Sequence, residues 1–211
     1  MPTLDTLLIF AGAALVLAAL PGPGLFYVAG RTLAGGRGVG LASSLGTGLG
    51  GLVHVGAGAL GVSALIVASA TAFTALKVVG GFYLLYLAWQ TWCSAGAAAL
   101  PDGSAPGMGA GRALRQGGVV EATNPKTAAF FLALIPQFVD PAQGNVALQF
   151  GALGLVSVAL NTAMAVLVVT LAASLRARVA ARPSLLRRLQ QGSAAILGSL
   201  GVWLLLSRRP S

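Results

Sequence analysis

Apolar residues occur in six long segments along this chain, and short polar stretches separate them. The segments cover residues 4–29, 40–70, 73–93, 117–139, 146–175 and 189–206. A helix needs roughly 20 apolar residues to cross a lipid bilayer, and the second and fifth segments are long enough to tilt. The pattern therefore predicts an all-α polytopic membrane protein with about six transmembrane helices.

The first segment could be mistaken for a secretory signal peptide. A signal peptide begins with a positively charged region, whereas the residues before this apolar stretch include Asp5 and no lysine or arginine. We therefore expect a first transmembrane span instead of a cleaved leader.

The amino-acid composition also indicates a membrane protein and not a soluble one. The chain is 56% hydrophobic and 8% charged, whereas soluble domains carry about 25% charged residues. The net charge of +9 sits in short clusters between apolar segments, which favours contact with anionic lipids over nucleic acid. Cys93 is the single cysteine, so neither an intrachain disulfide nor a cysteine-rich metal site is expected. We predict no cofactor.

Basic residues also predict the orientation in the membrane. They gather after the first, third and fifth segments, at Arg31, Arg37, Arg112, Arg115, Arg176, Arg178, Arg182, Arg187 and Arg188. Loops rich in lysine and arginine usually face the cytoplasm, which places both termini on the other side of the membrane, outside the cytoplasm. Arg208 and Arg209 near the C-terminus oppose this arrangement, and a topology with one fewer span stays open.

The segments divide into two sets of three. We expect a first repeat over residues 1–94, a cytoplasmic loop over 95–115 and a second repeat over 116–211. A set with an odd number of spans inverts the next set in the membrane, which is a common plan in transporters. Proline interrupts the first helix of each set, at Pro21 and Pro23 and at Pro125 and Pro136. Either Pro125 or Pro136 could correspond to the break in the first half.

Polar residues inside the apolar segments indicate a binding site. Asn124 is a favoured N-cap and Pro125 a favoured first helical residue, so a half-helix could begin there and another at Gly22-Pro23. The positive end of a half-helix can bind a carboxylate, and Lys126 adds a charge. A kink without a ligand is the alternative.

Three polar side chains lie near the middle of three different segments: His54, Lys126 and Asn161. Ionisable groups in a membrane usually face a cavity or pathway, so these residues and Glu121 could share one. Glu121 could hold an ammonium or carry a proton, and His54 could assist because histidine titrates near neutral pH. A buried ion pair, or hydrogen bonds between helices, would be the structural alternative. The glycine-rich second segment could serve close helix packing or leave room for a ligand.

Several motifs together resemble the LysE/RhtB amino-acid exporters over nearly the whole chain. They are Leu20-Pro21-Gly22-Pro23, the glycine-rich 35–40, and the block from Asn124-Pro125-Lys126-Thr127 to Pro136-Gln137-Phe138-Val139. The resemblance implies efflux of amino acids or derivatives from the bacterial cytoplasm by proton exchange, often as a homodimer. Many members carry a neutral residue where this chain has Glu121, and an acidic residue is frequent where it has His54.

These observations favour a secondary transporter over an enzyme. The predicted substrate-binding residues are Pro21, Gly22, Pro23, His54, Glu121, Asn124, Pro125, Lys126 and Asn161. The helix breaks and Lys126 would hold the α-carboxylate, and Glu121 the α-ammonium or the coupled proton. A non-transporting membrane subunit, or an exporter of another small solute, stays as the alternative.

Overall fold

The computed structural model describes residues 2–62, 64, 70–95, 109–179 and 183–206. These residues are almost entirely helical and include no strand, which confirms the all-α prediction. Large hydrophobic side chains such as Leu8, Leu60, Phe82 and Leu148 are more than half exposed. An apolar exterior of this kind suits contact with lipid.

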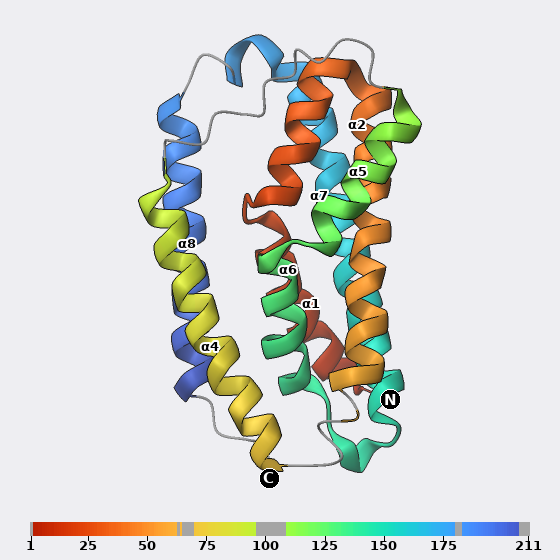
Figure 1. Cartoon of the computed structure of the whole chain (residues 1–211), viewed down its shortest axis with the longest axis vertical. Coiled ribbons are helices and arrows are strands. Elements are labelled where there is room, and N and C mark those ends of the chain that lie inside the picture. The colour runs from red at the N-terminus through yellow and green to blue at the C-terminus, as the bar shows by residue number, and fades with distance from the viewer. Residues whose placement is uncertain (1, 63, 65–69, 96–108, 180–182, 207–211) are drawn as a thin grey trace.

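The first apolar segment is a broken helix, as predicted. Helix α1 (Leu4–Ala19) ends just before Pro21, and α2 (Pro23–Ala57) begins directly after Gly22. Within α2, Gly36 has a φ of 80°, a left-handed conformation that glycine adopts at little cost. The chain reverses there and runs back along the molecule (Figure 1). The helix that begins at Pro23 thus continues past residue 29, where the first segment was expected to end, as far as the reversal at Gly36. A π-helical turn (Gly58–Val62) follows α2.

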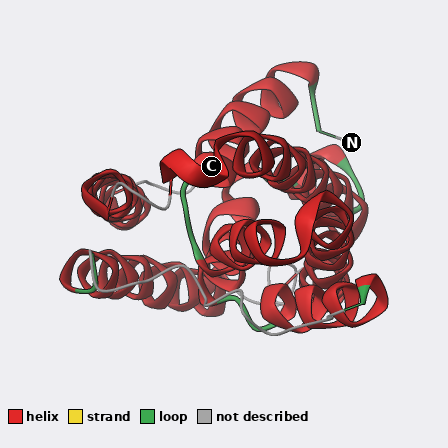
Figure 2. Ribbon diagram, turned by 90° about the horizontal axis from the view of Figure 1, so that it is seen from above, coloured by secondary structure: helices red, strands yellow, loops and turns green. Residues whose placement is uncertain are grey.

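Helices α4 (Ala70–Cys93) and α8 (Pro183–Leu206) form a pair at one side of the molecule (Figure 2). They approach closely where Gly81 faces Gly201, because a side chain at Gly201 would lie 3.0 Å from the Gly81 carbonyl oxygen. Small residues let helices in a membrane pack this closely. Both helices correspond to predicted segments.

The fourth segment is broken more than once. Helix α5 (Ala110–Ala122) is followed by α6 (Pro125–Ala129), a π-helical turn η2 (Phe130–Leu134) and a 3-10 helix η3 (Ile135–Phe138) around Pro136. The expected start at residue 117 was wrong, since α5 begins inside the predicted loop 95–115. Its first turns are amphipathic: Ala113 is buried against the bundle, whereas Arg112 and Arg115 are exposed, so they lack the hydropathy of a span.

A short 3-10 helix η4 (Pro141–Gln143) leads into α7 (Val146–Val179). Two helical stretches of the described residues, Pro23–Val62 and Val146–Ala172, are long and apolar enough to cross a membrane by length and composition. Helix α1 and residues Gln190–Leu206 are shorter apolar helices. Figure 1 shows that α1 begins and α8 ends at the same end of the molecule. The side of the membrane that this end faces stays a prediction.

Glycines of α2 set the spacing of the central helices. A side chain at Gly46 would collide with the Leu114 carbonyl of α5, and one at Gly51 would reach Val158 of α7 at 2.9 Å. The glycine-rich segment therefore serves close helix packing, one of the two predicted roles. This packing positions α5 and α7 around the broken ends of α1 and α6.

Candidate functional site

Two helix breaks meet inside the molecule. Gly22 is the N-cap of α2 and Pro23 its first residue, while Asn124 and Pro125 take the same places in α6. The Asn124 side chain accepts a hydrogen bond of 3.1 Å from the Lys126 backbone N–H, as expected of an N-cap. A helix end leaves backbone N–H or C=O groups without partners inside the helix, so each break exposes such groups in the interior.

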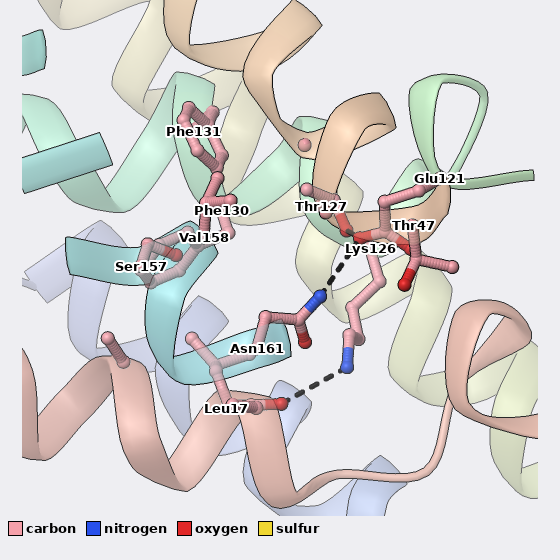
Figure 3. Close-up of a pocket in the computed structure, with 14 residues that line it drawn as sticks. Leu17, Thr47, Glu121, Lys126, Thr127, Phe130, Phe131, Ser157, Val158 and Asn161 are labelled. Carbon is pink, nitrogen blue, oxygen red and sulfur yellow. Dashed lines mark hydrogen bonds between the residues drawn. The ribbon is translucent and has the colours of Figure 1, made fainter. Parts of the chain in front are cut away.

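Lys126 binds the broken end of α1. Its Nζ donates hydrogen bonds to the carbonyl oxygens of Leu17, at 3.1 Å, and Leu20, at 2.9 Å. Figure 3 shows the side chain reaching across the pocket to Leu17. The C-terminal end of a helix carries a partial negative charge, and an ammonium group neutralises it. The last turn of α1 is thereby held to the fourth segment.

Glu121 is 1% exposed and accepts three hydrogen bonds. Its Oε1 accepts from Thr127 Oγ1 at 2.6 Å and from Asn161 Nδ2 at 3.3 Å, and its Oε2 accepts from Asn124 Nδ2 at 3.1 Å. The Oε2 atom also lies where a side chain on Gly24 would be. The carboxylate therefore sits at the N-terminal turns of α2 and α6, where the helix dipoles favour negative charge.

This arrangement differs from the expected one. The prediction had the N-terminal helix ends, together with Lys126, holding a substrate carboxylate. Instead, the protein's own Glu121 lies at those ends, and Lys126 lies at the C-terminal end of α1. The charges have separated because each is stabilised by the helix end of opposite sign.

A small cavity borders both charged groups. Its volume, measured as the space open to the centre of a water molecule, is about 30 Å³. Its lining includes the polar residues Glu121, Lys126, Asn161 and Thr47 and the apolar residue Phe130. A second space of about 10 Å³ lies beside Gly24 and Leu25. Typical ligand pockets measure about 300–1,000 Å³. The site therefore has room for water, and a larger solute requires the helices to move apart.

His54 lies beside the site without lining either space. Its Nε2 is 3.0 Å from the backbone oxygen of Glu121, and its ring packs on Phe131 at 5.6 Å between centroids. A carbonyl oxygen can only accept a hydrogen bond, so Nε2 carries the proton. The side chain thus holds the end of α5 and makes no contact with the Glu121 carboxylate.

The structure brings together Glu121, Asn124, Lys126 and Asn161 from the predicted set. Pro21, Pro23 and Pro125 shape the breaks, and Gly22 lies against the Lys126 side chain, since a Cβ there would be 3.3 Å from Cδ. The described residues hold no cluster of three or more histidine, cysteine or acidic side chains that could bind a metal.

Sequence reasoning missed five contributors: Gly24, Thr47, Thr127 and the carbonyls of Leu17 and Leu20. Thr127 directly follows Lys126 in the motif and has a polar side chain, which was a usable signal. The two carbonyls belong to apolar residues, so no side chain marks them.

Comparisons with known proteins give one family. The model for the LysE type translocator family matches residues 15–208. An uncharacterized membrane protein of Vibrio cholerae is 30% identical over 84% of this chain and 85% of its own length. Proteins of Salmonella typhi and Salmonella typhimurium, each named homoserine/homoserine lactone efflux protein, are 36% identical over 66% of this chain. The match spans 64% of their length. No solved structure matches the chain.

Proposed function

The chain belongs to the LysE type translocator family, and from this premise we propose that it exports amino acids or close derivatives from the bacterial cytoplasm. The relatives named for efflux of homoserine and homoserine lactone support this substrate class. The single observation that carries the proposal is the placement of Glu121 and Lys126 on one cavity, at helix ends of opposite sign.

The two groups suit a zwitterion. An α-ammonium group can bind Glu121 and the carbonyl oxygens of Leu17 and Leu20, which are the acceptors that Lys126 now occupies. The α-carboxylate of the substrate then pairs with the Lys126 ammonium. Charge-assisted hydrogen bonds of this kind are roughly twice as strong as neutral ones. The substrate carboxylate can therefore replace the carbonyl oxygens of α1 as the partner of Lys126, and this exchange releases α1 from Lys126.

Release of α1 would enlarge the cavity. Contacts between Lys126 and α1 hold the first half of the chain to the second, and the cavity of about 30 Å³ is too small for an amino acid. Transporters built from repeats alternate access by moving one repeat against the other around a site near the membrane midplane. We propose that the halves 1–94 and 116–211 move in this way.

Proton exchange would supply the driving force. Among the residues that the structure describes, Glu121 is the single carboxylate lining the cavity. Its hydrogen-bond partners Asn124 and Asn161 are neutral. Ionisable groups that face such cavities in transporters act as proton carriers. Glu121 would bind either the ammonium group or a proton, so that one leaves as the other arrives. His54 would keep α5 in place instead of carrying the proton.

Proteoliposomes test the proposal. Vesicles holding the purified chain are loaded with labelled homoserine, threonine, leucine or lysine, and efflux is followed with and without a pH gradient. We expect gradient-driven efflux of at least one of them, no coupling in Glu121→Gln, and normal efflux in the control Asp5→Asn, which changes an exposed carboxylate. A chain that supports no flux alone but co-purifies with a partner would instead be a membrane subunit.

Location and assembly follow from the same proposal. We place the protein in the inner membrane with both termini outside the cytoplasm, because the arginines beside the reversal in α2 and at the start of α5 would then face inward. A homodimer is the expected assembly, and the molecular mass of the purified protein in detergent tests it.

A further inference from the structure

A third and larger cavity lies away from the helix breaks, between the first part of α2 and α5. Its volume is about 520 Å³ by the same measure. Three arginines line it: Arg31 from α2, and Arg112 and Arg115 from α5. Val119 continues its wall toward the middle of the molecule and is 64% exposed. The cavity thus has a basic end and an apolar end.

The basic end has no acidic counterpart in the described part of the chain. The carboxylates there are Asp5, Glu121 and Asp140. Glu121 is buried in the other site, and the segments holding Asp5 and Asp140 lie at the opposite end of the molecule (Figure 1). Three positive charges around one open cavity attract anions.

Neutral groups position one of the arginines. Arg31 donates a hydrogen bond of 3.1 Å to Gln116 Oε1, and its guanidinium group lies 5.4 Å from the centre of the Tyr27 ring. Tyr27 is in turn fixed by its hydroxyl, which donates to the Ala113 carbonyl at 2.9 Å. Arg31 is thus held at the cavity wall with donor groups to spare, since a guanidinium offers five N–H donors.

The depth of the cavity in the membrane selects the kind of anion. On α5, Arg112, Arg115 and Val119 recur at helical spacing and share one face. Arg112 lies nine residues before Glu121, or about 14 Å along the helix. The hydrocarbon layer is about 15 Å deep from its middle to its edge. With the helix breaks near the middle, the arginines reach the level of lipid headgroups while Val119 lies among acyl chains.

We propose that this cavity binds an anionic phospholipid, with Arg31, Arg112 and Arg115 around the phosphate group and an acyl chain along Val119. Basic pockets between membrane helices bind lipid headgroups in this way. A soluble phosphate ester offers the same anion without the acyl chain. The lipid is favoured because the exposed valine continues the cavity toward the hydrocarbon. A bound lipid would join α2 to α5 on the outside, opposite the glycine contacts that join them inside.

Lipid binding to the full-length protein tests this site. The delipidated protein is titrated with phosphatidylglycerol, and separately with phosphatidylcholine and glycerol 3-phosphate, and the bound ligand is counted by native mass spectrometry. Each basic residue near a membrane surface contributes roughly 1 kcal/mol, or a factor of about five, to lipid binding. We expect the double variant Arg112→Gln and Arg115→Gln to bind phosphatidylglycerol roughly thirtyfold more weakly. Arg37→Gln, which removes an exposed arginine outside the cavity, should bind as the wild type does.

Three results would overturn the proposal. One is equal binding of phosphatidylglycerol and phosphatidylcholine by the wild type. Another is equal loss of binding in the double variant and Arg37→Gln, because general surface charge would then explain it. The third is binding of glycerol 3-phosphate as tight as that of the lipid, which would make this a site for soluble anions. Far-ultraviolet circular dichroism of each variant confirms that it is folded.

Discussion

Lys126→Met removes the ammonium group that joins the two halves while keeping most of the side-chain volume. The substitution deletes two hydrogen bonds, to Leu17 O at 3.1 Å and Leu20 O at 2.9 Å. Hydrogen bonds to charged groups contribute about 1.5–3 kcal/mol each. The two bonds together therefore stabilise the fold by about 3–6 kcal/mol, and the end of α1 also loses the neighbouring charge that its dipole favours.

Thermal unfolding of the purified protein in detergent measures this loss. For a protein of this size, the melting temperature falls by about 2–4 °C for each kcal/mol of stability lost. The melting temperature of Lys126→Met should therefore lie roughly 6–24 °C below that of the wild type. The conservative variant Lys126→Arg keeps the charge, so its melting temperature should fall less. The control variant Arg37→Met should melt at the wild-type temperature because Arg37 is exposed. If Lys126→Met melts within about 2 °C of the wild type, Lys126 does not hold α1, and the reasoning about the helix end is refuted.

Gly24→Ala should abolish efflux because the new Cβ would overlap Glu121 Oε2. In the control Gly12→Ala the new Cβ meets nothing within 4 Å, so this variant should transport normally. Equal efflux from both variants would contradict the close contact between Gly24 and the Glu121 carboxylate. Gly46→Ala should lower the melting temperature by an amount equivalent to about 1–3 kcal/mol, because the new Cβ meets the Leu114 carbonyl, while Gly56→Ala adds a methyl group in open space and should not. His54→Gln keeps an N–H donor for the Glu121 carbonyl and should retain gradient-driven efflux in vesicles; loss of coupling in this variant would make His54 the proton carrier.

The helical segments and the helix breaks could be predicted because each depends on local chemistry. Proline cannot continue a helix, so Pro21 and Pro125 marked the breaks, and Asn124 was recognisable as an N-cap. The reversal at Gly36 falls in the predicted loop between the first two segments. Its exact residue did not follow from the sequence, because the neighbouring glycines look alike and a positive φ depends on the tertiary path. The early start of α5 was missed because its first turns carry arginines and lack the hydropathy of a span.

The site could be predicted only in part. Glu121, Lys126 and Asn161 stood out because polar side chains are costly in an apolar segment. Their partners did not follow from the sequence, because Lys126 binds backbone oxygens of Leu17 and Leu20 that only the break in α1 sets free. The position of the Glu121 carboxylate depends on Gly24, almost a hundred residues earlier in the chain.

Gradient-driven efflux from proteoliposomes holding wild-type protein or Glu121→Gln tests the central claim most directly. The substituted side chain is nearly equal in size, and its amide oxygen can still accept hydrogen bonds from Thr127 and Asn161, while the bond from Asn124 to Oε2 is lost. Circular dichroism of the variant checks that the two proteins compared are both folded. The account predicts that efflux of the preferred amino acid rises with the pH gradient in the wild type and does not respond to the gradient in Glu121→Gln. Equal gradient-driven rates in the two proteins would show that the buried carboxylate between the helix breaks takes no part in transport.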